Sequence, residues 1–427
     1  MIVKNEAERL SGVMSDCRCF ADEIVVVDTG STDGTKAIAR GFTSSVFDFE
    51  WTNDFAAARN HSFTQATGRY ILWLDADDRI QPDMRGRINA LKAYFDGTRG
   101  FYFLLKNIHN DGHASSCYQL RCIPRRKDVC FEGRIHEQIF PAAIRSGLEL
   151  VTTDITVEHY GYTDHESRIA KAERNLSMLE KERQEGRDDE GLHFFLALTY
   201  EGLGREAEAI ASMEAALQKL ELRNRNSHLL IEAYLFLARY CMKEGKREQA
   251  LRFLAKGAAL VDGSPQHCFQ VGILYQRLER HAQALSWLDQ VPDRQPAPGL
   301  YPTHTLPSRE EILLHITYSL LCMRKNVEAM ETLRNIWKLG HNIRESWEWL
   351  GLKALGSGRI GLAIHAFEAA LRAGKLSLGG YLNMGRCYRI QGFVQKARQC
   401  WHMALESDPT NQDVLRELDS LQLQQLK

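Results

Sequence analysis

The chain has 427 residues, a formal net charge of −1 and 26% charged residues, which is an ordinary composition for a soluble globular protein. This length allows two or three domains with sizeable cores. The near-neutral charge gives no overall basic excess of the kind that favours nucleic acid as a partner. The sequence contains no window of about 18 apolar residues, so no membrane span is expected. The opening residues MIVKNEAERL do not have the pattern of a signal peptide.

The ten cysteines are scattered along the chain, and none forms a C-x2-C pair. A zinc site is therefore not expected. Several cysteines fall inside helical repeats, where a reduced thiol serves as a small core side chain. This pattern predicts a reducing, cytoplasmic location.

The first 160 residues alternate strand-like and helix-like segments. This order is typical of a parallel, doubly wound sheet. The third strand is apolar along its whole length, as expected of a strand that is covered on both faces. The predicted segments are a strand at 23–27, a helix from near Thr32, a strand at 46–49, a helix at 54–67 with Asp54 as its N-cap, and a strand at 70–74.

Two aspartates follow strands of this predicted sheet. Asp28 comes after the strand at 23–27, and Asp75 comes after the strand at 70–74. Ligands bind at the carboxyl ends of the strands in sheets of this kind. We therefore expect Asp28 and Asp75 to lie at a ligand-binding edge.

The sequence ILWLDADDR at residues 71–79 places three carboxylates directly after the apolar strand. Like charges this close repel each other. Asp75 and Asp77 would hold a hard divalent cation through oxygen ligands, which offsets the repulsion and leaves positions for phosphate oxygens. Asp78 is interpreted as a helix cap or a supporting residue. The alternative for all three is a solvated acidic loop that caps the next helix.

The loop DTGSTDGT at residues 28–35 consists mainly of small residues, which let a ligand approach the backbone. Asp28, at the tip of the strand, is placed to accept a hydrogen bond from a nucleobase. Ser31, Thr32 and Asp33 line the same loop, and the alternative for them is to cap the following helix. The loop matches neither G-x-G-x-x-G nor the P-loop pattern, so neither site is expected.

Other segments supply further candidates, each with an alternative. Arg59 would bind a diphosphate through two hydrogen bonds, or it would be a surface helix charge. His136 and Glu137 in FEGRIHEQI suit general-base catalysis, or they are a buried structural histidine beside a surface glutamate. His159 would complete an oxygen-rich metal shell, or it would be a core residue or a cap.

The second part of the chain contains two clear copies of a pattern that repeats after 34 residues. This is the period and pattern of tetratricopeptide repeats. The small residues let the two helices of a hairpin approach closely, and the aromatic residues fill the next gap. The matching pairs are Gly351/Gly385, Gly358/Gly392, Ala363/Ala397, Phe367/Trp401 and Ala370/Ala404.

Weaker copies precede these two, and together they predict about six helical hairpins. The charged, helix-prone segment 165–190 is interpreted as a linker helix. Four prolines at 293–308 predict a long loop inside the solenoid. The predicted divisions are therefore 1–164, 165–190 and 191–427.

Six segments of the first part together resemble family 2 glycosyltransferases of the GT-A fold. They are MIVKNE, VVVDTGSTDGT, NDFAAARN, LWLDADD, FEGRIHE and EHYGYT, and their order and spacing fit the family. With the appended repeats, the chain is similar to the sublancin-type peptide S-glycosyltransferases. The resemblance implies an α/β GT-A domain, Rossmann-like with a mostly parallel sheet, followed by an all-α tetratricopeptide-repeat solenoid.

The resemblance also implies roles for individual residues. Glu137 is favoured over His136 as the catalytic base, although the segment lacks the acidic pair that is common in the family. Asp77 would be the principal ligand of Mg²⁺ or Mn²⁺, with His159 as a further ligand. The implied nucleotide-sugar site consists of Val3, Asn5, Glu6, Asp28, Ser31, Arg59, Asp75 and Ala76.

The resulting hypothesis is an inverting, metal-dependent enzyme that transfers a sugar from a nucleotide-sugar, expected to be a UDP-sugar, to a peptide or protein. A thiol or hydroxyl of the acceptor would attack, and the repeats would help to dock it, because solenoids present grooves suited to extended peptides. One alternative is a saccharide or lipid-linked acceptor in cell-envelope polysaccharide synthesis. Another is a repeat scaffold with an inactive transferase domain. No nucleic-acid partner is expected, and a homodimer is left open.

Overall fold

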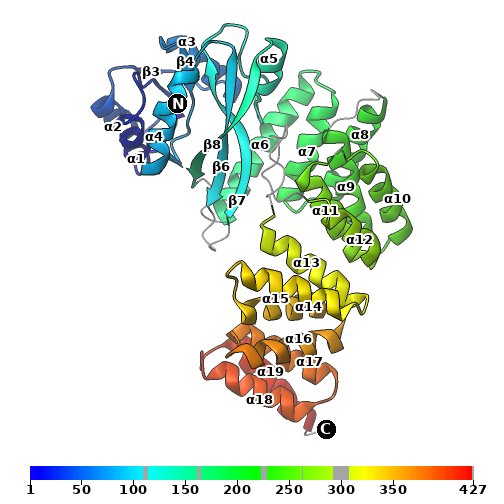
Figure 1. Ribbon diagram of the computed structural model, residues 1–427. Coiled ribbons are helices and arrows are strands. Elements are labelled where there is room, and N and C mark those ends of the chain that lie inside the picture. Colours follow the sequence, from blue (N-terminus) through cyan, green and yellow to red (C-terminus); the bar gives the residue numbers. More distant parts are fainter. Residues whose placement is uncertain (109–113, 161–164, 223–227, 262, 292–306, 426–427) are drawn as a thin grey trace. The chain divides into compact units, whose positions relative to one another are not determined.

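The computed structural model describes residues 1–427 except 109–113, 161–164, 223–227, 262, 292–306 and 426–427. The chain forms two compact units (Figure 1). Among the described residues, one unit lies within 1–266, and the other lies within 267–291 and 307–425. The predicted loop at 293–308 lies almost entirely outside the described residues.

A three-stranded parallel sheet with the order β1-β2-β3 forms the start of the chain. Val26 and Val27 of the central strand are buried, as suits β-branched residues in a covered sheet. A helix connects each strand to the next, so the predicted parallel strand-helix-strand order is confirmed here. The elements are β1 (Ile2–Val3), α1 (Leu10–Cys17), β2 (Val26–Asp28), α2 (Thr35–Phe42) and β3 (Val46–Asp48).

A second, five-stranded sheet has the order β4-β7-β6-β8-β5 and is mixed. Its β6 and β8 run parallel, and its other neighbours run antiparallel. The strand predicted at 70–74 pairs antiparallel with β7 instead of extending the parallel sheet. The long strands β6 and β7 pair with each other and bring β7 beside β4, which no local pattern reveals (Figure 1). The strands are β4 (Tyr70–Leu72), β5 (Asp78–Arg79), β6 (Arg99–Ile108), β7 (Ala114–Pro124) and β8 (Glu149–His159).

The remaining helices of this α/β part pack around the two sheets. Helix α3 begins after Asp54, whose carboxylate accepts a hydrogen bond from the Ala57 N–H at 2.8 Å, so the predicted N-cap is confirmed. Leu10, Phe101 and Phe103 belong to one buried core that joins helix α1 to strand β6. The elements are α3 (Phe55–Gln65), α4 (Pro82–Leu91), η1 (Lys92–Tyr94) and α5 (Phe140–Arg145).

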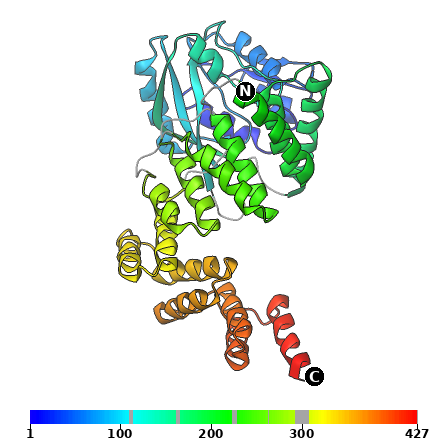
Figure 2. The same ribbon diagram turned by 90° about the vertical axis from the view of Figure 1, so that its right-hand side faces the viewer.

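The described residues beyond His165 form helices joined by turns, as the repeats predict (Figure 2). The described part of this region contains six consecutive helix pairs, α7–α8 to α17–α18, between α6 and α19. A Cβ atom added to Gly351 would lie 2.8 Å from the Phe367 ring, and one added to Gly385 would collide with Trp401. The small residues thus admit the aromatic side chains, as predicted. The helices are α6 (His165–Gln184), α7 (Glu190–Gly202), α8 (Glu206–Leu222), α9 (His228–Lys243), α10 (Arg247–Ala258), α11 (Pro265–Arg277), α12 (His281–Leu288), α13 (Arg309–Cys322), α14 (Asn326–Lys338), α15 (Ile343–Gly356), α16 (Ile360–Ala373), α17 (Leu378–Ile390), α18 (Val394–Leu405) and α19 (Gln412–Gln425).

The first helices of the repeat region share a core with the α/β part. Ile135 belongs to the same cluster of buried side chains as Phe195 on α7 and Tyr234 on α9. Trp51 and Phe55 pack against this cluster. The predicted borders after residues 164 and 190 separate sequence patterns, whereas the first compact unit continues to residue 266.

A cavity of about 360 Å³ lies near the amino ends of β1, β2 and β4. Its lining includes Met1, Ile24, Tyr70 and Phe95 and is mainly apolar. Asp28 is the last residue of β2, and the aspartates after β4 follow that strand, so both lie at the opposite, carboxyl ends. This cavity is therefore not the predicted ligand-binding edge.

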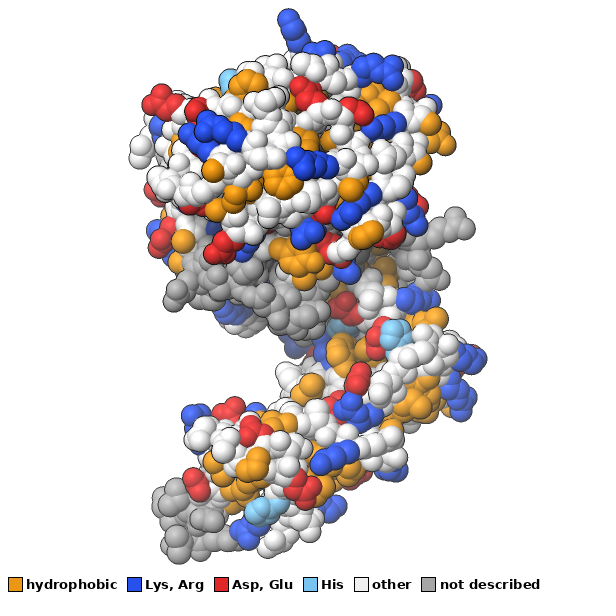
Figure 3. All heavy atoms as spheres, turned by 90° about the vertical axis from the view of Figure 1, so that its left-hand side faces the viewer, with side chains coloured by type: hydrophobic (Ala, Val, Ile, Leu, Met, Phe, Trp, Pro, Cys, Tyr) orange, Lys and Arg blue, Asp and Glu red, His pale blue; other side chains and the backbone are white. Residues whose placement is uncertain are grey.

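The surface carries charges of both signs. On the face drawn in Figure 3, Lys and Arg side chains are interspersed with Asp and Glu and with small groups of hydrophobic side chains. This distribution agrees with the formal net charge of −1. No helix in the described ranges combines the length and the apolar character needed to span a membrane.

Candidate active site

Asp28 ends strand β2 and organises the loop that follows it. Its Oδ1 accepts hydrogen bonds from the N–H groups of Gly30 at 3.0 Å and Ser31 at 2.9 Å. The residue is only 1% exposed, and its Oδ2 has no hydrogen-bond partner among the described residues. A buried carboxylate oxygen without a donor is unfavourable. The site therefore suits a ligand that brings an N–H group to Oδ2.

The segment after β1 is held against this loop. The Oδ1 of Asn5 accepts from the Thr32 N–H at 2.8 Å, and the Oγ of Ser31 accepts from the Asn5 N–H at 2.9 Å. Asn5 has a φ of 56°, a left-handed conformation that asparagine tolerates well. The Glu6 N–H donates to the Thr35 hydroxyl at 2.8 Å. The structure thus brings together Asn5, Glu6 and Ser31, which the sequence places in the predicted nucleotide-sugar site.

Two other residues of the predicted nucleotide-sugar site have buried apolar side chains. Val3 is 3% exposed, and its carbonyl oxygen accepts from the Thr29 N–H at 2.9 Å. Ala76 is 5% exposed and belongs to the same core as Val3. Only the backbone of these two residues is therefore available for polar contacts with a ligand.

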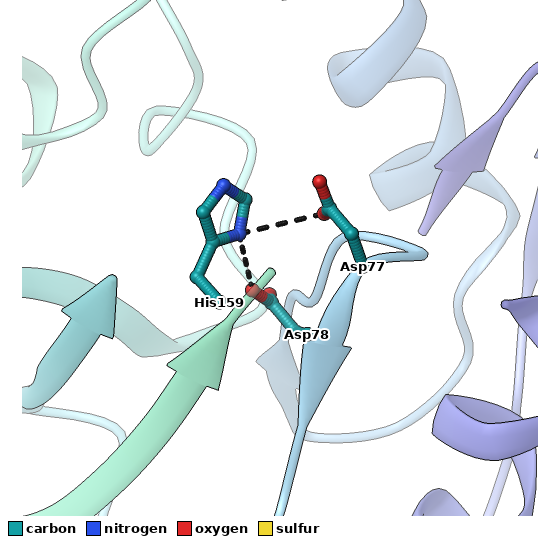
Figure 4. Close-up of side chains that lie close together, drawn as sticks. All are labelled: Asp77, Asp78 and His159. Atoms are coloured by element: carbon teal, nitrogen blue, oxygen red, sulfur yellow. Dashed lines mark hydrogen bonds and ion pairs between the residues drawn. The ribbon is translucent and has the colours of Figure 1, made fainter. Parts of the chain in front are cut away.

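The acidic triplet after β4 folds into a tight turn. The Asp75 N–H donates to Oδ2 of Asp78 at 2.8 Å, and the Asp78 N–H donates to the Asp75 carbonyl at 3.1 Å. Strand β5 pairs with β8 in a register that sets Asp78 opposite His159. The Nδ1 of His159 lies 2.9 Å from Oδ1 of Asp78 and 3.4 Å from Oδ1 of Asp77 (Figure 4). The turn and the strand pairing together explain how Asp78 and His159 meet, although they are 81 positions apart in the sequence.

Asp77, Asp78 and His159 fit a divalent metal ion. One ligand atom from each residue lies within 4.8 Å of the others. Burial raises the pKa of Asp77, and the charges of Asp75 and Asp78 raise it further against the effect of His159. The excess negative charge and the oxygen and nitrogen donors suit Mg²⁺ or Mn²⁺. The interpretation of Asp78 as a supporting residue is compatible with the hydrogen bond that its Oδ2 accepts from the Asp75 N–H. Its Oδ1 lies beside Nδ1 of His159 and is therefore also placed to be a metal ligand.

Glu6 extends this acidic group. Burial raises its pKa, and the charge of Asp77 is the next largest cause, followed by opposing and like charges from neighbours that include Asp75. Burial lowers the pKa of His159, but the hydrogen bond that its ring donates to Asp78 and the charge of Asp77 outweigh burial and raise the pKa. Charges therefore interact across three parts of the site, namely the segment after β1, the acidic turn and β8.

Arg59 on α3 connects the acidic turn to the loop that holds Glu137. Its Nη1 lies 2.9 Å from Oδ1 of Asp75, and its Nε lies 2.7 Å from Oε1 of Glu137. The guanidinium also lies over the Trp73 ring at 4.6 Å. Burial alone would raise the pKa of Asp75, but Arg59 and Arg121 hold it well below its usual range. With a side chain only 11% exposed, Arg59 is not the surface charge of the alternative interpretation.

Arg121 on β7 is a member of the network that the sequence analysis missed. Its Nη1 lies 2.9 Å from Oδ2 of Asp78 and 3.7 Å from Oδ2 of Asp75. Its guanidinium stacks over Trp73 at 3.9 Å, and the residue is 1% exposed. The available signal was a lone arginine inside the apolar strand CYQLRCIP, which requires a buried acidic partner.

The two candidates for the catalytic base have different surroundings. Glu137 is paired with Arg59 and has a side chain 14% exposed. The ring of His136 stacks on Phe195 with a centroid distance of 4.3 Å. Burial, with a smaller contribution from the charge of Lys171, lowers the pKa of His136 to about 4. Its Nε2 has no hydrogen-bond partner in the described part of the chain. His136 is therefore neutral near pH 7 and packs as a flat, largely apolar group.

Comparison with known proteins also divides the chain into an α/β part and a helical repeat region. Residues 1–100 match the profile of Glycosyl transferase family 2, and residues 191–218 match Tetratricopeptide repeat. A TPR repeat-containing protein of Synechococcus elongatus is 31% identical over 188 residues, which cover 42% of this chain and 46% of that protein. The SPbeta prophage-derived glycosyltransferase SunS of Bacillus subtilis is 25% identical over 240 residues, which cover 54% of this chain and 55% of that protein.

Among solved structures, a tetratricopeptide repeat protein from Parabacteroides merdae matches with a TM-score of 0.39 and 16% identity, covering 61% of this chain and 98% of that one. The chain spans about half the length of the curated relatives it matches. The two profile matches fall on the α/β part and on helices α7 and α8. The N-terminal domain of the chain thus belongs to glycosyl transferase family 2, and tetratricopeptide repeats follow it.

Proposed function

We propose that this protein transfers a sugar, with inversion, from a UDP-sugar to a peptide or protein acceptor in a metal-dependent reaction. The observation that carries the proposal is the continuous charged network that runs from Asp77 through Asp75 and Arg59 to Glu137. One end of this network suits a metal and a diphosphate, and the other end presents a carboxylate for proton transfer. The family match of residues 1–100 supports the transfer chemistry.

The donor would lie along the carboxyl edge of the strands. The free Oδ2 of Asp28 supports a hydrogen bond from a nucleobase N–H. Asn5, Glu6 and Ser31 line the adjoining loops, where ribose hydroxyls would find polar partners. Asp77, Asp78 and His159 would hold Mg²⁺ or Mn²⁺. When bound, such a cation neutralises part of the charge of a diphosphate.

Glu137 would act as the base. Its carboxylate takes the proton of an acceptor thiol or hydroxyl, and the acceptor atom forms a bond to the anomeric carbon of the sugar. In the same step the bond from that carbon to the diphosphate oxygen breaks, and the nucleoside diphosphate leaves with the electron pair. A single displacement of this kind inverts the configuration. Arg59, which contacts both Asp75 and Glu137, is positioned to stabilise the charge on the departing diphosphate.

The acceptor part of the proposal draws on the repeats and on the resemblance to peptide S-glycosyltransferases. Repeat solenoids present extended surfaces suited to peptides in extended conformation. A saccharide or lipid-linked acceptor would use the same donor chemistry. These acceptors are distinguished by supplying the enzyme with labelled donor and with thiol-containing peptides, hydroxyl-containing peptides or oligosaccharides.

The donor chemistry is tested without knowledge of the acceptor. A panel of nucleotide-sugars is screened with Mn²⁺ or Mg²⁺ for thermal stabilisation and for release of nucleoside diphosphate by hydrolysis. We expect one UDP-sugar to protect the protein in the presence of metal and to be hydrolysed. Asp77→Asn should lower the hydrolysis rate by about 100-fold or more.

Asp83→Asn is the matched control, because Asp83 is an exposed acid in the first turn of α4. It should leave hydrolysis unchanged. The proposal is wrong if no nucleotide-sugar is bound or hydrolysed. The metal assignment alone is wrong if Asp77→Asn and the control hydrolyse the donor equally fast.

A further inference from the structure

Residues 132–138 form a loop that is closed at its base and contains Glu137. Glu132 and Gln138 exchange two backbone hydrogen bonds of 2.9 Å each. Gly133 and His136 adopt left-handed conformations with φ values of 87° and 53°. Such a conformation is unfavourable for a non-glycine residue, and it persists only where the surroundings hold it. The neighbours of this loop therefore determine where Glu137 lies.

Helix α3 holds the loop from one side. The side chain of Asn60 donates to the Phe131 carbonyl at 2.9 Å and accepts from the Phe131 N–H at 2.8 Å. The N–H of Phe55 donates to the Arg134 carbonyl at 2.8 Å. These contacts lie within the α/β part of the chain, and they hold the start of the loop and the backbone at Arg134.

Helices α6 and α7 hold the tip of the loop from the other side. The Arg134 N–H donates to Oε1 of Glu182 at 3.3 Å, and the Arg134 guanidinium pairs with Glu185 at 2.8 Å. Ile135 is 5% exposed and belongs to the core formed by these helices. The ring of His136 lies parallel to that of Phe195, with an interplanar angle of 9°. Three successive residues directly before Glu137 thus contact the helical region.

We propose that Phe195 and Glu182 are positioning residues for Glu137, so that α6 and α7 form part of the catalytic unit. This inference rests on the role of Glu137 as base in the proposed function. Phe195 holds the left-handed backbone at His136 through ring stacking, and Glu182 holds the backbone of Arg134. Loss of either contact lets the loop relax and moves the Glu137 carboxylate away from Arg59 and the acceptor. The helical region then contributes to the chemistry as well as to any docking of the acceptor.

The test compares two buried phenylalanines of the same core. Phe195→Leu keeps an apolar side chain and removes the stack on His136. Phe236→Leu is the matched control, because Phe236 is 3% exposed on α9 and packs on Tyr240 at 4.8 Å. Amide hydrogen exchange of residues 131–138 is measured in both variants, together with hydrolysis of the UDP-sugar selected by the donor screen.

For Phe195→Leu we expect exchange in the loop to rise about tenfold and kcat to fall about tenfold, with the KM for the donor unchanged. Phe236→Leu should change neither the loop exchange nor kcat. Glu182→Gln is a second, milder variant that should raise exchange at Arg134 and lower kcat in the same direction. The inference is overturned if Phe195→Leu leaves both readouts at their wild-type values, or if Phe236→Leu changes them equally.

The two proposals fail in different ways. If the wild-type protein hydrolyses no nucleotide-sugar, the proposed function fails, while loop exchange in Phe195→Leu still decides whether α7 holds the loop. If the wild-type protein hydrolyses the donor, and Phe195→Leu matches it in both loop exchange and kcat, the positioning role fails and the proposed function stands. A truncation meant to test acceptor docking must also retain α6 and α7, because removal of Phe195 would disturb Glu137.

Discussion

Two regions of the protein are stabilised by different kinds of contact. One is the carboxyl edge of the strands in the first unit, and the other is the set of repeats in the second unit. At the edge, Arg59 and Arg121 are buried against Asp75 and Asp78, and both guanidinium groups lie over Trp73. In the repeats, a glycine admits a large ring, as Gly385 does for Trp401. The first region buries charged side chains, whereas the second buries closely packed apolar side chains.

This difference distinguishes contacts that mainly stabilise the fold from contacts whose charges suit ligand binding. Buried ion pairs lose hydration that their mutual attraction repays only in part, so well-packed apolar side chains often stabilise a protein as much or more. The repeats use the packing that favours stability. The edge retains charges whose arrangement suits a metal and a diphosphate. Substitutions that remove one member of each kind of contact should therefore have different consequences.

The largest effect is expected from Arg121→Leu. It leaves the carboxylates of Asp75 and Asp78 without one buried partner, so the free energy of unfolding of the first unit should fall by about 3–5 kcal/mol. The control is Arg126→Leu, because Arg126 and Asp128 form an exposed pair that water screens, so its loss should change stability little. Amide hydrogen exchange in β4 and β7 measures both. Equal losses in the two variants would contradict the special role of Arg121.

A smaller effect is expected in the second unit from Gly385→Ala. The added Cβ would collide with the Trp401 ring, which should cost about 1–3 kcal/mol. Gly379→Ala lies in the same helix, and its Cβ would meet only the Ser377 hydroxyl at 3.9 Å. That control should be neutral or stabilising by about 0.5–1 kcal/mol, because alanine favours the helix. Exchange in α17 and α18 reports both changes, and donor hydrolysis by the first unit should be unaffected.

The smallest effect is a dependence on pH. The pKa of His136 is lowered from 6.5 to about 4. Between these values the unfolded chain binds more protons than the folded one, so stability is complete above pH 6.5 and falls as the pH decreases. The loss from pH 7.5 to 5.5 should be about 1 kcal/mol. His136→Asn, which tolerates the left-handed backbone, should remove this contribution when exchange at 131–138 is compared at the two pH values.

Several features of the fold could be predicted because their signals are local. The N-cap at Asp54 and the close approach at Gly351 and Gly385 depend on residues near each other in the sequence. The antiparallel pairing of β4 with β7 could not be predicted, because strand partners are chosen by packing of the whole sheet. Arg121 was missed for the same reason, since its acidic partners precede it by more than 40 residues.

The candidate site shows the same limit. The sequence names Asp75, Arg59 and Glu137, and the tertiary structure connects them. It also separates the two base candidates, because Glu137 meets Arg59 whereas His136 meets Phe195. Residue type indicates that a carboxylate and an imidazole can each accept a proton. Only their neighbours decide which one stays polar and accessible.

The sequence was enough to predict an α/β domain with acidic strand ends and a following set of helical repeats, because strand alternation, small-residue spacing and apolar periods are properties of neighbouring residues. The tertiary structure decided the pairing of β4, the burial of Arg121 and the support of the Glu137 loop by α6 and α7. These features depend on contacts such as that of Arg59 with Glu137, which are 78 residues apart. Burial and partner choice over such separations come from the packing of the whole unit, which no short pattern encodes.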